Sequence, residues 1–439
     1  MQLTNKASVA TALAGAACAL LGTPAVQAEE DMLKDWKFDT AILYYGETDR
    51  VSLAEGVINA TKTNDDDSIF NVKLVIDTLT GASANGAVAQ PSAQTFSRPS
   101  GKDGYVVNAG ETPLDDTFRD TRVQVSSSWM QPFADTWRAT GAVNVSTEYD
   151  YLSLGLSGLL EKDLFMRNTT LSAGLSFQFD SIDPVGGTPD ALTSMLVPTY
   201  IGDDVGEGED EFEWDDDYEE GENKTGSESK TTTDLIVGVT QVINRRMLMQ
   251  FNYGLSVVDG YMTDPYKLVS VVDGAGMTQD VIYEGRPDSR TKHSFFWQTK
   301  YALDSGVVDV SYRFATDDWE IDSHTIDSRF RFNLGDNNYI QPHLRYYQQS
   351  AAEFYRPFLN QNDPMPMYAS ADYRVGEMTA YTVGLKYGHK MENGHEWAVR
   401  AEYYQQDPKN AGFDEPGVLA DLDLYPSVKA VILQFNYHF

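Results

Sequence analysis

The last eleven residues, Lys429 to Phe439, constrain most strongly what this chain can fold into. Apolar and aromatic residues stand at every second position of this segment, with polar residues between them. The apolar row consists of Val431, Leu433, Phe435, Tyr437 and Phe439. Alternate side chains of a β-strand point to opposite faces, so one face suits hydrocarbon and the other suits water. A soluble β-sandwich could end in this way, but a final strand that stops on Phe is typical of outer-membrane barrels.

The first 28 residues have the pattern of a secretory signal peptide. Lys6 supplies the positive charge, residues 10–21 form the apolar core, and Ala28 ends a small-residue cleavage site. Cleavage there predicts a mature chain of residues 29–439. For an exported chain with this C-terminus, we expect outer-membrane lipid and lipopolysaccharide as surroundings. We also expect recognition of the strand ending at Phe439 by the barrel-assembly machinery.

Cysteine content and charge exclude several classes of function. Cys18, the only cysteine, lies within the signal segment. It could be a lipidation site, although Gly15 stands where a lipobox has Leu. Cleavage after Ala28 would remove Cys18, which excludes disulfides, Cys-ligated metals and thiol nucleophiles from the mature chain. The formal net charge of -33 argues against nucleic acid as a partner.

Period-two alternation bounded by turn residues predicts about 16 β-strands, with about 14 or about 18 as alternatives. They lie near residues 36–46, 50–61, 69–80, 117–130, 135–149, 151–160, 168–180, 231–244, 248–258, 290–303, 306–317, 320–334, 338–349, 374–390, 394–406 and 427–439.

The links between these strands alternate in length. Every second link is short, whereas most of the others are long, as at residues 81–116 and 181–230. Short periplasmic turns that alternate with long outer loops are expected of outer-membrane barrels, and a soluble sandwich has no reason to sort its loops in this way. The predicted fold is therefore all-β: one transmembrane antiparallel barrel over residues 29–439. Its lumen would hold water or a plug of loops.

Alternation along the predicted strands also assigns charged side chains to the lumen, where cations outnumber acids. The inward positions singled out as lumen candidates are Arg313, Asp327, Arg329, Arg331, His343 and Arg345. The functional interpretation is an electropositive lumen that favours anions. The structural alternative is a network of ion pairs that only stiffens the wall.

One predicted outer loop is strongly acidic, with thirteen acids in the twenty residues 203–222. Like charges at this density repel and keep a segment solvated, which is the simplest interpretation. Carboxylate oxygens could also bind Ca²⁺ or Mg²⁺ weakly at the surface. The candidate ligands are Asp203, Asp204, Asp215, Asp216 and Asp217. No other cofactor is expected.

A second outer segment could carry chemistry. Its candidate catalytic residues are Asp317, Asp318, Asp322 and His324. Asp322 and His324 are reminiscent of the Asp-His pair of omptin surface proteases, in which a carboxylate orients an imidazole that activates water. The structural alternative is a hydrogen-bonded outer turn with one polar histidine.

Motifs along almost the whole mature chain carry a resemblance to a known family. They stand at residues 77–87, 118–122, 149–152, 167–171, 184–187, 259–267, 283–290, 317–319, 323–325 and 342–347. With these motifs the chain resembles the bacterial outer-membrane barrel family catalogued as domain of unknown function 3570. The resemblance implies a barrel but supplies no accepted substrate or catalytic residue. It also implies an exported redox partner, because members are associated with exported redox and flavin-transfer genes.

Several of these motifs fall on predicted outer loops. Gly81 and Gly86 suit backbone turns at positive φ. We expect the loops to fold inward and form a constriction, although a pure packing role is the alternative. The cations of this constriction are Lys267, Arg286 and Arg290, and the acids facing them are Asp317, Asp318 and Asp322.

The function predicted from the sequence is a passive pore or export conduit with a charged, net basic lumen. A surface hydrolase of omptin type is one alternative, which would use Asp322 and His324. A non-conducting barrel that scaffolds an envelope redox, electron-transfer or metal-handling system is the other. The sequence names neither a solute nor an oligomeric state, and a homo-oligomer remains compatible with it.

Overall fold

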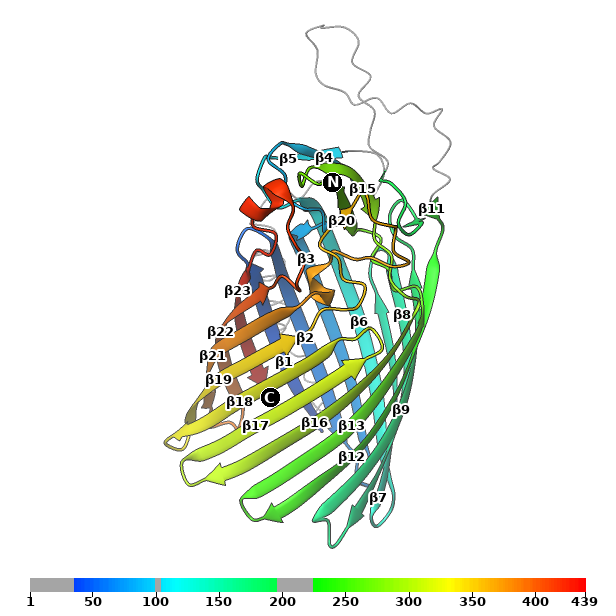
Figure 1. The fold of residues 1–439 in the computed structure, drawn as a ribbon. Coiled ribbons are helices and arrows are strands. Elements are labelled where there is room, and N and C mark those ends of the chain that lie inside the picture. Colours follow the sequence, from blue (N-terminus) through cyan, green and yellow to red (C-terminus); the bar gives the residue numbers. More distant parts are fainter. Residues whose placement is uncertain (1–34, 99–103, 196–223) are drawn as a thin grey trace, which may run out of the picture.

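The structure, a computed structural model, describes residues 35–98, 104–195 and 224–439. These residues form a closed antiparallel barrel in which each strand pairs with the next barrel strand along the chain (Figure 1). The barrel strands are β1 (Trp36–Glu47), β2 (Val51–Thr63), β3 (Ile69–Ala84), β6 (Leu114–Ala134), β7 (Trp137–Thr147), β8 (Tyr151–Leu164), β9 (Thr169–Ile182), β12 (Glu228–Asn244), β13 (Met247–Gly260), β16 (Ser289–Leu303), β17 (Gly306–Asp317), β18 (Asp322–Leu334), β19 (Asn338–Gln349), β21 (Met378–Lys390), β22 (Glu396–Pro408) and β23 (Val428–His438). Pairing of β1 with β23 closes the sheet and leaves no edge.

The prediction of an all-β barrel with about 16 strands is confirmed. Even the three weakest predicted segments, at 50–61, 151–160 and 231–244, are the barrel strands β2, β8 and β12. β21 begins at Met378 and not near residue 374 as predicted, because a 3-10 turn, η1 (Tyr373–Val375), precedes it. The predicted signal peptide and the acidic loop 203–222 lie outside the described residues.

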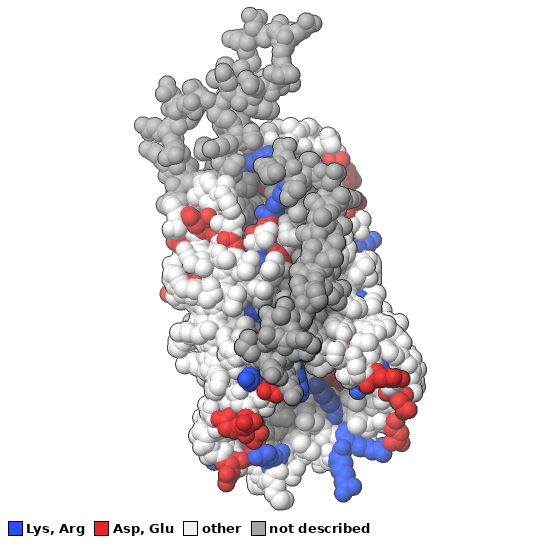
Figure 2. Space-filling model, turned by 180° about the vertical axis from the view of Figure 1, so that it is seen from behind, with Lys and Arg blue, Asp and Glu red and all other residues white. Residues whose placement is uncertain are grey.

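The outward face of the wall is apolar, the reverse of a soluble protein. Large apolar side chains such as Leu156, Phe177, Leu344 and Val383 are more than half exposed. In Figure 2 charged side chains gather toward the two ends of the barrel, and the zone between them is mostly uncharged. This pattern fits an apolar band flanked by polar ends. No helix in the described part of the chain is both long and apolar enough to cross a membrane.

The described outer links contain regular secondary structure. They contain three small sheets and a further 3-10 turn, which gather at the upper end of Figure 1. The elements are β4 (Gln94–Ser97), β5 (Gly104–Val107), β10 (Thr188–Pro189), β11 (Lys224–Thr225), β14 (Leu268–Val272), β15 (Thr278–Tyr283), β20 (Leu359–Asn360) and η2 (Gly417–Asp421). We call the described links after β3, β9, β13, β19 and β22 the outer cap.

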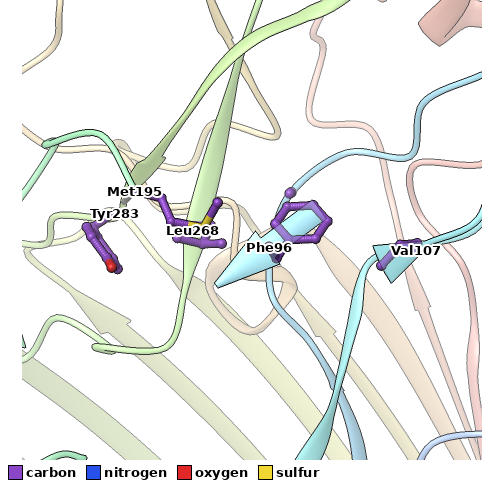
Figure 3. Close-up of a cluster of buried hydrophobic side chains, with 6 residues drawn as sticks. Phe96, Val107, Met195, Leu268 and Tyr283 are labelled. Carbon is purple, nitrogen blue, oxygen red and sulfur yellow. The ribbon is translucent and has the colours of Figure 1, made fainter. Parts of the chain in front are cut away.

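The outer cap has hydrophobic clusters of its own. One of them joins the links after β3, β9 and β13 (Figure 3), and its buried members are Ala87, Phe96, Val107, Met195, Leu268 and Tyr283. Gly86 enters this region at φ +98°, and a Cβ there would lie 2.4 Å from the carbonyl oxygen of Leu268. Burial of each such apolar side chain stabilises the folded cap by about 1.5–3 kcal/mol. The outer cap is therefore a packed body.

Candidate functional site

Charged side chains line the inward side of β16 to β22, which we call the cationic wall. The register aligns Asp309, Arg329 and His343 in one inward row across three strands. By the same alternation the inward cations are Arg290, Lys292, Lys300, Arg313, Arg329, Arg331, Arg345, Lys386, Lys390 and Arg400, and the inward acids are Asp309, Asp317, Asp327, Glu396 and Glu402. Cations therefore outnumber acids on this wall.

Most cations of the cationic wall lack an ion-pair partner. Lys300, Arg329 and Arg400 lie near Asp309, Asp327 and Glu402, at 3.7, 3.3 and 3.6 Å. Arg290 pairs with Asp317. Among the described residues, the others have no carboxylate oxygen within 4.0 Å, and they are Lys292, Arg313, Arg331, Arg345, Lys386 and Lys390. No neighbouring carboxylate of the described residues thus neutralises their charge.

Two arginines of this set lie over aromatic rings instead of beside carboxylates. The guanidinium of Arg331 lies 3.7 Å from the ring centre of Tyr339, and that of Arg313 lies 5.4 Å from the ring centre of Phe296. A ring face fixes the position of a guanidinium without neutralising its charge. These two arginines are therefore ordered and still positive.

His343 is the most densely hydrogen-bonded group of the cationic wall. Its Nδ1 lies 2.8 Å from Oε1 of Glu402, and its Nε2 lies 3.0 Å from Oδ2 of Asp327. Glu402 reaches His343 across Gly384, where a Cβ would lie 2.5 Å from the Glu402 Cγ. An ionised carboxylate can only accept a hydrogen bond, so two ionised partners require a proton on each ring nitrogen. The arrangement thus favours an imidazolium at this position.

The opposite part of the wall is more acidic, and several of its acids are paired. Arg122 lies 2.8 Å from Asp77, and Arg138 lies 2.6 Å from Asp163. Near the outer end, potential ligand oxygens of Asp120, Glu148 and Asp150 lie within 4.8 Å of one another. Burial and the neighbouring carboxylate of Asp120 raise the pKa of Glu148 to about 7.

A buried ionic network lies inside the outer cap. The side chain of Arg286 contacts Glu284 at 2.7 Å and Asp372 at 2.8 Å. Glu284 and Asp372 have 0% and 1% of their surface exposed. Burial alone would raise the pKa of Asp372, but Arg374, Lys267 and Arg286 hold it below its usual range. For Glu284, burial outweighs Arg286 and raises the pKa.

Lys267 and Arg290 have different partners from each other. Lys267 is buried and donates to Oγ of Ser83, at 3.3 Å, and to the carbonyl oxygen of Ala84. Arg290 pairs with Asp317 and lies over the ring of Trp319. Of the expected constriction, only Arg290 and Asp317 are thus joined directly, whereas Lys267 and Arg286 enter the buried part of the cap.

The four candidate catalytic residues do not converge. The Asp317 carboxylate accepts from Arg290 and from two backbone N–H groups, and Asp318 accepts from the backbone of Thr291. His324 pairs across strands with Phe314 on the outward face, and its Nδ1 lies 2.8 Å from the Tyr312 hydroxyl. In the described structure no hydrogen bond joins His324 to Asp322.

Sequence analysis missed the acidic half of the cap network. Its acids are Asp264, Glu284 and Asp372, of which Asp264 and Asp372 both pair with Arg374. These acids stand in three separate stretches with no spacing signal. The one available signal was the position of Glu284 beside Arg286 in a motif of the resembling family. The group Asp120, Glu148 and Asp150 was missed because its members come from different strands and turns.

A family model described as Protein of unknown function (DUF3570) matches residues 10–439. No curated protein matches the chain. Similar solved structures include CdiB from Acinetobacter baumannii, with a TM-score of 0.44, 8% identity, and coverage of 92% of this chain and 60% of that one. The siderophore receptor PirA from Acinetobacter baumannii has a TM-score of 0.41 and 9% identity, and the match covers 90% of this chain and 57% of PirA.

A third similar structure is a loop-deletion mutant of OmpT, an outer membrane protein of Vibrio cholerae. Its TM-score is 0.38 at 10% identity, with coverage of 92% of this chain and 98% of that chain. The chain spans only about 60% of the length of CdiB and of PirA. At these identities the likeness is one of fold alone.

Proposed function

The chain belongs to the family described as Protein of unknown function (DUF3570), and we propose that it is an outer-membrane conduit that favours small anions. The observation that carries this proposal is the set of cations on the cationic wall without carboxylate partners. Arg313 and Arg331 are its fixed members, because Phe296 and Tyr339 hold their guanidinium groups.

The unpaired cations would attract anions through their electric field. A narrow aqueous passage between walls of low dielectric constant focuses the field of fixed charges, so unpaired cations raise the local concentration of anions. A ladder of fully paired charges would have stiffened the wall without this effect. The unpaired cations therefore favour the functional interpretation over the structural alternative.

The presence of the outer cap favours a selective conduit as the function and argues against an open general pore. Its hydrophobic clusters and its buried network at Arg286 and Asp372 pack several long links together at the outer end of the barrel. A packed body of this kind restricts the passage, so the solute would be small or the cap would have to move.

The proposal is tested by single-channel conductance of the refolded mature protein in planar bilayers, with the reversal potential measured across a salt gradient. We expect openings that favour chloride over potassium. The double variant Arg313→Ala with Arg331→Ala should bring the selectivity close to neutral. Arg167→Ala is the matched control, because this arginine lies on the predicted periplasmic turn after β8 and is exposed.

Two results would overturn the proposal. One is a folded barrel that never conducts, which would shift weight to a scaffold for an exported redox partner. The other is cation selectivity in the wild-type protein that the double variant leaves unchanged. The hydrolase alternative is not favoured, because His324 faces outward against Tyr312 and Phe314.

A further inference from the structure

Two histidines on the outward face form the same pair with a tyrosine. Nδ1 of His293 lies 2.8 Å from the hydroxyl of Tyr253, and Nδ1 of His324 lies 2.8 Å from the hydroxyl of Tyr312. In each pair the two rings stack with centres 6.1 Å apart. The repeat of one geometry at two places on the same face indicates a common role.

We assign the tautomer of each imidazole from its tyrosine partner. A phenol O–H is a stronger donor than an imidazole N–H, so the tyrosine donates to Nδ1 and the ring proton lies on Nε2. Both histidines then present an N–H donor that points away from the tyrosine. Both lie in the outer parts of their strands, β16 and β18, where the apolar band meets the polar end of the barrel.

An apolar groove adjoins these pairs on the outward face. Its volume is about 440 Å³, and it crosses β12, β13, β16 and β17, among the green strands at the front of Figure 1. Tyr253 and Tyr312 line it, so the residues that orient the imidazoles also form the groove. Its other outward side chains are Val237, Val239, Phe251, Phe295 and Trp297. Since a water molecule takes about 30 Å³, the groove has room for roughly fifteen groups of that size.

We propose that this face binds an outer-leaflet lipid with one acyl chain in the groove, and that ester or amide carbonyls of this lipid accept hydrogen bonds from His293 and His324. The apolar groove takes the methylene chain, and the two Nε2 donors, which flank β17, each meet a carbonyl of the groups that join the acyl chains to the headgroup. The inference rests on the membrane placement in the proposed function and does not depend on ion conduction.

The charges around the histidines favour a carbonyl over a phosphate. By strand alternation Asp259 and Asp322 occupy outward positions near the outer ends of β13 and β18. Asp322 is two residues from His324, and Asp259 is on the strand that pairs with the strand of His293. These acids would repel a phosphate group placed at the imidazoles, whereas a neutral carbonyl at the same place is unaffected. The remaining cross-strand neighbours, which are Leu255, Thr316, Phe314 and Gln348, carry no charge.

The backbone argues against a peptide as the occupant. Every strand around the groove is paired on both sides within the closed barrel, so no edge is free to add a strand. The groove itself is almost wholly apolar, and its polar donors stand at one end only. An acyl chain has the same division between an apolar body and a polar end.

The test uses the full mature chain, refolded in detergent and incubated with purified hexa-acylated lipid A. Native mass spectrometry then measures the fraction of barrels that retain one lipid. We expect His293→Phe and His324→Phe each to lower the affinity roughly two- to tenfold, the worth of one hydrogen bond. Val239→Trp fills the groove without touching the imidazoles and should lower retention further.

A matched control exists at the other end of the barrel. Nδ1 of His395 lies 2.8 Å from the Tyr437 hydroxyl, which is the same hydrogen bond with the two rings edge to face, and neither residue lines the groove. His395→Phe should leave lipid retention at the wild-type value. Heat-modifiable migration on a gel verifies that each variant is folded.

The outcomes separate the alternatives. Equal retention by wild-type protein, Val239→Trp and His324→Phe would overturn the proposal, as would equal loss in His395→Phe. Retention of phosphatidylethanolamine at the same level would keep the acyl site and assign it to any diacyl lipid. Because retention is measured without current, a barrel that fails to conduct anions can still pass this test.

Discussion

The guanidinium of Arg286 lies 2.8 Å from the carboxylate of Asp372, which stands 86 residues further along the chain. This contact ties the link after β13 to the link after β19 inside the outer cap. Both side chains are almost completely buried, and Glu284 contacts the same guanidinium group. The cap is therefore held by paired charges as well as by its hydrophobic clusters.

Asp372→Asn should loosen the outer cap and leave the barrel intact. Removing one partner of a buried ion pair leaves an uncompensated charge, which costs about 3–5 kcal/mol. Hydrogen exchange should increase across residues 261–288 and 350–377, with little change in the barrel strands. Arg246→Ala is the control, because its exposed pair with Asp304 contributes about 0–1 kcal/mol. Unchanged protection of the cap in Asp372→Asn would contradict the role assigned to the network.

Gly86→Ala tests the close approach between the links after β3 and β13. The new Cβ would lie 2.4 Å from the carbonyl oxygen of Leu268, and φ at this position is +98°. We expect protease cleavage within the cap to accelerate while heat-modifiable migration of the barrel is retained. Gly110→Ala separates the steric clash from the backbone strain, because φ at Gly110 is also positive, at +78°, but no atom lies within 4 Å of the new Cβ. Its cost should be limited to about 1–2 kcal/mol of backbone strain.

The stability of the barrel should depend on pH through Glu148. Its pKa is raised from 4.5 to about 7 in the folded chain, because burial and Asp120 disfavour the ionised form. The folded state then binds more protons than the unfolded state between these two values. The contribution of Glu148 to the free energy of unfolding is therefore fully present below pH 4.5 and is lost as the pH rises through about 7.

The measurement is the midpoint of urea unfolding at several pH values in lipid bilayers. Glu148→Gln stays neutral at every pH, so it should remove this part of the pH dependence and stabilise the barrel at pH 8. Identical pH profiles for the wild-type protein and the variant would show that Glu148 does not titrate in this range.

Phe439→Ala should slow assembly of the barrel. Phe439 stacks on Phe38 with ring centres 5.2 Å apart, and its backbone exchanges hydrogen bonds with Phe38 where β1 meets β23. The variant loses the final aromatic ring at the seam that closes the sheet. We expect less folded protein in outer-membrane fractions, measured by heat-modifiable migration. Met166→Ala, a fully exposed change on a turn, should assemble like the wild-type protein.

Strand number and side-chain facing could be predicted from the sequence because both depend on local rules. Alternation of period two determines which side chains share a face of the sheet. The alternating lengths of the links indicate at which end of the barrel each link lies. The outward row of Val431, Leu433 and Phe435 follows from this periodicity. The inward row that contains Arg329 and His343 follows from it as well. The start of β21 was misplaced because the side chain of Asp372 forms a local turn with the backbone of Arg374.

The sequence by itself determined the barrel, because every strand carries its own alternation and closure satisfies the remaining backbone groups. Only the tertiary structure decided which charges meet. His343 reaches Glu402 across Gly384, and Arg286 reaches Asp372 across 86 residues, through contacts that no local pattern encodes. Long links fold according to the packing of side chains that are distant in sequence. The partners of Lys267 and the outward position of His324 therefore became visible only in three dimensions.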